Sequence, residues 1–327
     1  KFVQSDANPA ESGIEIRDLP SPSSIESTDR RRPEQKAPGD SRCFNGIVEG
    51  GRSVSSYSAI VRHGEYQRFD PAMKEDIIGF PRGAHAGNAL HDIFENLDFL
   101  NPGSWEGTVL SVLTDYNLAG EDHVWVEPVT GCAANILQTR YAPHINDPKV
   151  DDPKVDDPKN GFRLCDIQPE RRIAEMEFYL KCRSVRRENF IDLLGPVAGD
   201  IRPRELSGWL HGFIDLVFEI GNRYYVLDWK SNYLGAEESD YAHDRLEEAM
   251  TEHNYFLQAY IYSLALHRHL EKRLETYSYE THFGGVIYLF LRGFTGVRDM
   301  TEGNMEGIFF QKPDAGLIHG LSREVTG

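Results

Sequence analysis

Residues 208–235 read GWLHGFIDLVFEIGNRYYVLDWKSNYLG and carry the clearest structural signal in the chain. Two runs rich in β-branched and aromatic residues flank Gly221-Asn222, a dipeptide typical of two-residue hairpin turns. With that turn, counting back along both strands places Asp215 opposite Asp228. We therefore predict an antiparallel hairpin that carries one acid on each strand at the same level.

These two acids and a nearby lysine form a candidate catalytic site. Side chains alternate between the faces of a strand, so Asp215, Asp228 and Lys230 are all expected on one side of the sheet. Directly opposed residues have Cβ atoms ~5 Å apart. Two like charges at that distance repel by roughly 3 kcal/mol at an effective dielectric of about 20, which favours a cation bound between them. The alternative is a solvated strand face, because D-x-K alone is a weak motif.

The arrangement resembles the PD-(D/E)xK nuclease superfamily, with Asp215 as the first acid and Asp228-Trp229-Lys230 as the D-x-K. Longer runs are similar to RecB-type nuclease domains, over roughly residues 50–325 in collinear order. These runs are FPRGAHAGNALHDIFENLDF at 80–99, YYVLDWKSNYLG at 224–235 and HFGGVIYLFLRG at 282–293. The resemblance implies a restriction-endonuclease-like core. Strands interleaved with helical patterns independently predict an α/β fold with a mixed central sheet flanked by helices.

The resemblance also implies a metal site. The expected ion is Mg²⁺, with Mn²⁺ as a substitute, because hard oxygen ligands that leave room for water suit these ions. Its ligands would be His91, Asp215, Asp228 and the backbone carbonyl of Trp229. Without the family pattern, His91 reads as an ordinary polar helix residue. Lys230 would hold or help deprotonate the attacking water, and it also serves as a counter-charge for the acids.

Three further site residues follow from the same resemblance. Glu175, in AEMEFYL, stands where the family carries a site-facing acid, and Glu177 is the competing assignment because it shares the same strand face. Gln258 and Tyr262 match the family's Q-x-x-x-Y and lie one helical turn apart. They are expected either to contact DNA or Lys230, or to form a hydrogen bond at the edge of the core.

The chain has 327 residues, and its 35 basic and 52 acidic side chains give a net charge of −17. This balance argues against a broad non-specific DNA-binding surface but leaves room for a local basic channel. An ordinary solvated face is the alternative for the densest basic stretch, which comprises Lys181, Arg183, Arg186, Arg187, Arg202 and Arg204.

We predict two regions along the chain: a disordered linker or tail at 1–45 and a nuclease domain at 46–327. The repeat DPKVDDPKVDDPK at 147–159 has a proline every five residues and is expected to be an exposed insertion. The chain begins with Lys1 and lacks a G-x-x-x-x-G-K-[ST] motif, so we expect a fragment of a longer protein without its own ATP motor. Helices are predicted near 87–99, 108–118, 124–139 and 240–272, and strands at 173–180, 208–220, 223–231, 284–293 and 307–313.

The four cysteines lack close pair spacing, which favours a reducing compartment, and we expect a cytoplasmic protein. No cysteine follows Cys182, whereas nucleases related to this family that hold an iron–sulfur cluster use cysteines after the Q-x-x-x-Y helix. We therefore expect no cluster.

Together these features predict a metal-dependent DNA nuclease of a RecBCD-type helicase–nuclease complex that serves double-strand-break repair and recombination. The resemblance implies DNA, RecC-like and RecD-like subunits and a RecA-type recombinase as partners. Two alternatives are a catalytically silent nuclease fold that only docks partners, and a free-standing repair or restriction nuclease.

Overall fold

The hairpin predicted around Gly221-Asn222 lies at the centre of the computed structural model, which describes residues 53–56, 76–142, 161–195, 205–303 and 305–326. Strand β3 (Glu205–Ile220) turns into β4 (Arg223–Lys230), with Ile220 paired to Arg223. Both turn residues have positive φ, 54° and 63°. A primed turn of this kind matches the right-handed twist of the flanking strands. The predicted register is confirmed as far as the last pair, Leu216 with Leu227.

Six described strands form one mixed sheet in the order β1-β3-β4-β5-β6, with β2 on the other edge of β3. β2 and β3, β3 and β4, and β5 and β6 are antiparallel, whereas β1 and β3, and β4 and β5, are parallel. The remaining strands are β1 (Ser53–Ser56), β2 (Arg172–Arg186), β5 (Phe283–Phe290) and β6 (Ile308–Gln311). The parallel pair β4 and β5 is central, and every residue of β5 is buried, as expected for a strand covered on both faces.

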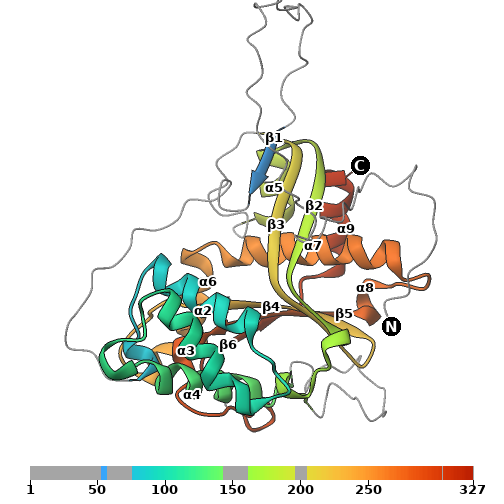
Figure 1. Ribbon diagram of the computed structural model, residues 1–327. Coiled ribbons are helices and arrows are strands. Elements are labelled where there is room, and N and C mark those ends of the chain that lie inside the picture. Colours follow the sequence, from blue (N-terminus) through green and yellow to red (C-terminus); the bar gives the residue numbers. More distant parts are fainter. Residues whose placement is uncertain (1–52, 57–75, 143–160, 196–204, 304, 327) are drawn as a thin grey trace, which may run out of the picture. The chain divides into compact units, whose positions relative to one another are not determined.

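Helices cover both faces of the sheet, so the expected α/β class is confirmed (Figure 1). One hydrophobic core lies between the sheet and α2 (Ala84–Asn96), α3 (Trp105–Asp115) and α4 (Val126–Gln138). The other core lies between the sheet and α6 (His243–Glu252), α7 (Tyr255–Arg273) and α9 (Ala315–Thr326). Two short helices, α5 (Arg187–Leu194) and α8 (Tyr279–His282), complete the described helices.

The predicted single helix at 240–272 is wrong, because α6 and α7 are separate helices. Asn254, between them, has a left-handed backbone with φ 58°, which asparagine tolerates better than most residues. Asp240 is not the cap of a long helix; it closes a capping box with Glu237 in the 3-10 turn Glu238–Tyr241. The terminal helix α9 was not predicted either.

Several sequence predictions lie outside the described residues. These are the tail at 1–45, the repeat at 147–159 and the side chains of Arg183, Arg186, Arg187, Arg202 and Arg204. Lys181 is described and exposed. Within the described ranges, no helix combines the length and hydrophobicity needed to cross a membrane.

Candidate active site

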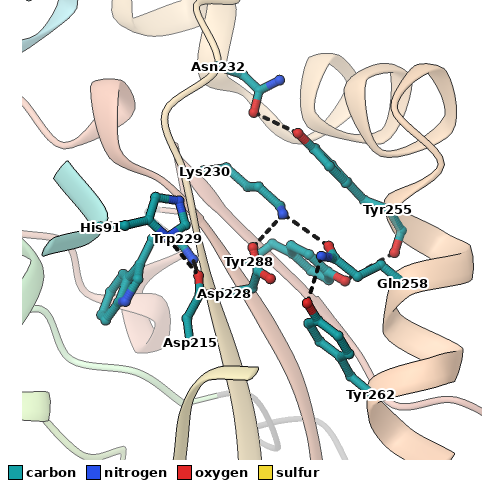
Figure 2. A network of polar contacts seen from close by, with 10 residues as sticks. All are labelled: His91, Asp215, Asp228, Trp229, Lys230, Asn232, Tyr255, Gln258, Tyr262 and Tyr288. Carbon is teal, nitrogen blue, oxygen red and sulfur yellow. Dashed lines mark hydrogen bonds and ion pairs between the residues drawn. The ribbon is translucent and has the colours of Figure 1, made fainter. Parts of the chain in front are cut away.

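Asp228 and Lys230 lie two residues apart at the end of β4 and form a buried ion pair. Lys230 Nζ also donates to Gln258 Oε1 at 2.9 Å, and Gln258 Nε2 donates to Tyr262 Oη at 3.0 Å (Figure 2). Burial opposes the lysine charge, but the negative charges beside it, Asp228 first, hold the pKa of Lys230 above its ordinary value. Gln258 and Tyr262 thus lie on one helix face as predicted, with Gln258 bonded to the charged lysine and Tyr262 bonded to Gln258.

Two tyrosines that belong to none of the sequence motifs surround the same ammonium. Lys230 Nζ lies 3.9 Å from the ring centre of Tyr255 and 5.3 Å from that of Tyr288. The Tyr255 hydroxyl donates to Asn232 Oδ1 at 3.0 Å, and the Tyr288 hydroxyl donates to the Tyr255 carbonyl at 3.0 Å. Ring faces attract cations at these distances. Tyr255 could have been predicted at the site, because it lies one helical turn before Gln258.

Asp215 lies one residue beyond the last registered pair of β3 and β4. Its Oδ2 accepts the backbone N–H of Trp229 at 2.8 Å and lies 3.3 Å from Nδ1 of His91, on α2 (Figure 2). Burial and then the Asp228 charge raise the pKa of Asp215 well above its usual range. The two predicted acids are therefore close enough to repel each other.

His91 is held between the acid and the β4 backbone. Burial lowers the pKa of this histidine, which keeps its imidazole neutral and able to bind a metal at pH 7. A hydrogen bond with the backbone of Trp229 acts in the opposite direction.

The prediction that all three residues share one strand face is only partly correct. Ile214 and Val217, three residues apart, both belong to the core on the α7 side, while Leu216 belongs to the core on the α2 side. Strict alternation cannot place residues three apart on one face, so β3 shifts its faces at Asp215. As a result Asp215 reaches His91 on α2, whereas Lys230, beside Asp228, reaches α7.

The neighbouring strand β2 has a matching irregularity at Glu175. This residue has a positive φ of 48° and drops out of the register between Ala174, paired with Leu216, and Met176, paired with Ile214. Positive φ is uncommon for a side chain of this size and indicates local strain. The irregularity therefore lies directly beside Asp215.

The structure separates the two competing glutamates. Burial, followed by the charges of Glu95, Asp228 and Asp92, raises the pKa of Glu175. Glu177 is exposed instead; it accepts from the Tyr179 hydroxyl at 2.9 Å and lies 2.9 Å from His211 Nε2. The geometry thus favours Glu175 as the third acid of the site.

Helix α2 is held close against the end of β4, which positions His91. A Cβ atom added at Gly87 would lie 2.8 Å from Ser231 Oγ, so a glycine permits this approach. One turn beyond His91, the Phe94 ring stacks on Trp229 with centroids 4.3 Å apart. Arg292 also links the two elements, because it donates hydrogen bonds both to the segment before α2 and to the Ser231 carbonyl after β4.

The chemistry of these donors fits a hard divalent cation, although the side chains do not form a ready cage. Carboxylates, a neutral imidazole and a carbonyl are suitable ligands. Asp228 Oδ1 is buried and paired with Lys230, but it accepts no hydrogen bond of ordinary geometry from the described residues. In the same described ranges, no three His, Cys, Asp or Glu side chains are gathered closely enough to hold a metal ion. The described cysteines Cys132, Cys165 and Cys182 are free thiols.

Comparison with curated proteins finds several RecB proteins. The chain is 36% identical over 299 residues to the RecBCD enzyme subunit RecB of Escherichia coli (strain K12), covering 84% of this chain and 23% of that protein. It is 32% identical over 253 residues to the same subunit of Haemophilus influenzae, covering 76% and 19%. It is 42% identical over 135 residues to that of Mycobacterium tuberculosis (strain ATCC 25618 / H37Rv), covering 41% and 12%.

The chain therefore spans less than a quarter of the length of these relatives. No protein-family model matches it. The matches confirm the resemblance that the sequence motifs indicate: over most of its length the chain is similar to part of RecB. Its mixed sheet flanked by helices agrees with the fold that this resemblance implies (Figure 1).

Proposed function

We propose that this chain is a metal-dependent DNA nuclease that hydrolyses phosphodiester bonds in single strands delivered from a DNA end. The observation that carries the proposal is the meeting of Asp215, Asp228 and Lys230 where β3 leaves β4. Burying two acids and an ammonium together costs stability, and such costly groups of charges are found mainly where a site performs chemistry or binds a cation. Similarity to a subunit of the RecBCD enzyme supports the nuclease part of this proposal.

Each residue has a role in this proposal. Asp215, Asp228, His91 and the Trp229 carbonyl would hold Mg²⁺, or Mn²⁺ in its place, and the bound ion would supply an activated water and charge neutralisation. Lys230 would orient the water and offset charge on the phosphate.

Residues around the lysine would support this chemistry. Gln258 fixes the lysine by a direct hydrogen bond, and Tyr262 fixes Gln258. Glu175 would add a third negative charge beside the metal ligands. The resulting donor set is made of oxygen and imidazole groups, which suit Mg²⁺ or Mn²⁺.

The biological setting follows from the relatives, which are named as subunits of the RecBCD enzyme. By analogy this chain would act in the cytoplasm within a helicase–nuclease complex, in DNA repair and recombination. Its partners would be RecC-like and RecD-like subunits, and a RecA-type recombinase would dock on the same domain. A catalytically silent docking module is disfavoured, because the acids and the lysine are all in place.

The direct test is incubation of the purified chain with end-labelled linear single-stranded DNA and Mg²⁺, with and without chelator. We expect cleavage that chelator abolishes, and loss of cleavage in Asp215→Ala and Lys230→Gln, with circular dichroism spectra that show both variants to be folded. Asp166→Asn and Lys312→Gln are matched controls, because Asp166 forms an exposed ion pair and Lys312 contacts the Glu280 carbonyl at the surface.

Cleavage by the two site variants within a few-fold of the native rate would overturn the residue assignment. A native chain that binds Mg²⁺ and DNA without cleaving would overturn the proposed activity and favour the docking module.

A further inference from the structure

Beyond the end of β4, strands β2 and β3 continue together as a ribbon, and the short strand β1 pairs with β3 along Gly208–His211 (Figure 1). Its two faces differ. One face is buried in the core on the α7 and α9 side and carries Phe178, Leu180, Cys182, Leu210 and Ile214. On the opposite face, Phe213 is 44% exposed and Tyr179 is 49% exposed. The ribbon is therefore amphipathic with an aromatic open face.

Three rings on this open face touch one another and form an aromatic row of Tyr179, His211 and Phe213. Tyr179 and His211 are paired across the strands, and their rings stack with centroids 4.4 Å apart. His211 meets Phe213 edge to face at 5.1 Å. Cross-strand ring pairs stabilise sheets, which accounts for the first contact. It does not account for a phenylalanine that leaves nearly half its surface in water.

The aromatic row starts beside the proposed catalytic acid. Phe213 is two residues from Asp215. Ile214 between them is buried in the core on the α7 side, whereas Asp215 contacts His91 on the opposite, α2 side. Each two-residue step along a strand is ~7 Å, so His211 is ~14 Å from Asp215 along β3. That is the length of about four nucleotides in a duplex strand, and of fewer when a strand is stretched.

We propose that the aromatic row is a stacking platform for unpaired nucleobases of the strand that is cleaved at Asp215 and Asp228; this rests on the proposed function. Every base presents a flat π-face, so aromatic rings bind single strands with little sequence preference. Bases inside a duplex are already stacked on their neighbours and cannot use the platform. The row would therefore select single-stranded substrate next to the reacting phosphate.

The charges around the row fit bases rather than phosphates. Hydrogen bonds from Tyr179 and His211 lower the pKa of Glu177, which keeps a negative charge among the rings. That charge repels phosphates, so the backbone of a bound strand would turn outward and its bases would turn toward the rings. Exposed Lys181, the next residue on the same face of β2, offers a contact for a phosphate at the far end.

The test measures binding in chelator, where no cleavage occurs, by fluorescence anisotropy. Two labelled oligonucleotides of equal length are compared: one of thymidines, and one with abasic sites that keep the phosphates but lack the bases. We expect the native chain to bind the thymidine strand about tenfold more tightly.

Phe213→Leu and Tyr179→Leu keep apolar contact within the ribbon but remove a ring, and each should lose most of that difference while binding the abasic strand as before. Phe213→Trp should retain it. Leu110→Ala, at an exposed apolar position on α3, is the matched control and should behave like the native chain.

Equal binding of the two oligonucleotides by the native chain would overturn the inference without any variant. So would an undiminished difference in both leucine variants. The proposed function is tested separately by Mg²⁺-dependent cleavage. If the chain cleaves single strands but binds the two oligonucleotides equally, the stacking platform is refuted and the proposed function stands.

Discussion

Arg292→Leu should be the most damaging single substitution outside the acids and the lysine. The guanidinium is 1% exposed and donates to backbone carbonyls rather than to a carboxylate. It accordingly joins the segment before α2 to the chain just after Lys230. The accepting carbonyls are those of Ile77, Ile78, Phe80, Pro81 and Ser231.

The magnitude follows from these bonds and from the cost of burying the charge. Four of the five are 2.6–2.9 Å long, and the fifth, at 3.3 Å, is weak. Leaving a buried carbonyl without its donor costs about 1–3 kcal/mol, so four cost roughly 8 kcal/mol. Burial lowers the pKa of Arg292 to about 10, a desolvation cost of about 3 kcal/mol that leucine would not carry. The expected loss of stability is therefore about 5 kcal/mol.

Urea unfolding followed by circular dichroism measures this loss directly. Arg292→Lys keeps one charge and fewer bonds and should lose an intermediate amount. Arg268→Leu, which removes a partly exposed arginine paired with Glu271, should change stability by less than about 1 kcal/mol. A loss of the same small size in Arg292→Leu would refute the reasoning. It would show that water or a rearranged backbone satisfies the carbonyls.

Three other predictions address the site. Gly87→Ala should push α2 away from β4, lowering cleavage at least about tenfold with a melting temperature within about 4 °C of native. Glu175→Gln should reduce Mg²⁺-dependent cleavage at least about tenfold more than Glu177→Gln. A larger loss of cleavage in Glu177→Gln would show that the assignment of the third acid is wrong. Asp228→Asn should destabilise the chain in chelator by about 3 kcal/mol, because buried Lys230 loses its ion pair. A higher melting temperature would instead show that repulsion between the acids dominates.

The expected sign of the Asp228→Asn effect on stability differs between the sequence and the structure. Counted from the hairpin register alone, Asp215 and Asp228 are a like-charge pair whose repulsion Lys230 relieves only in part, and neutralising one acid should stabilise the metal-free chain. The structure reverses this expectation because the lysine turns onto Asp228 and is held there by Gln258. Sequence spacing gives the order of residues on a face but not which of two acids a flexible lysine chooses.

The hairpin could be predicted because a two-residue turn sets the register of everything that follows it. The break between α6 and α7 could not, since the apolar spacing continues through it and the left-handed backbone of Asn254 is its only local cause. The shift of faces at Glu175 and Asp215 has no sequence signal either. Neither residue is a glycine, and a strained glutamate is held in place by its surroundings.

That same shift explains why the site and the aromatic row occur together. As long as β3 pairs with β4, its side chains are divided between two helix-covered faces, and Asp215 could not meet both His91 from α2 and the Asp228–Lys230 pair beside α7. Where β3 leaves β4, the Trp229 N–H loses its strand partner and binds the Asp215 carboxylate instead. β2 and β3 stay paired beyond this point, and Phe213 is exposed there. The acids thus meet where the strand pairing changes, and the exposed aromatic row lies beside them. A single DNA strand bound on that row would lead directly to the acids.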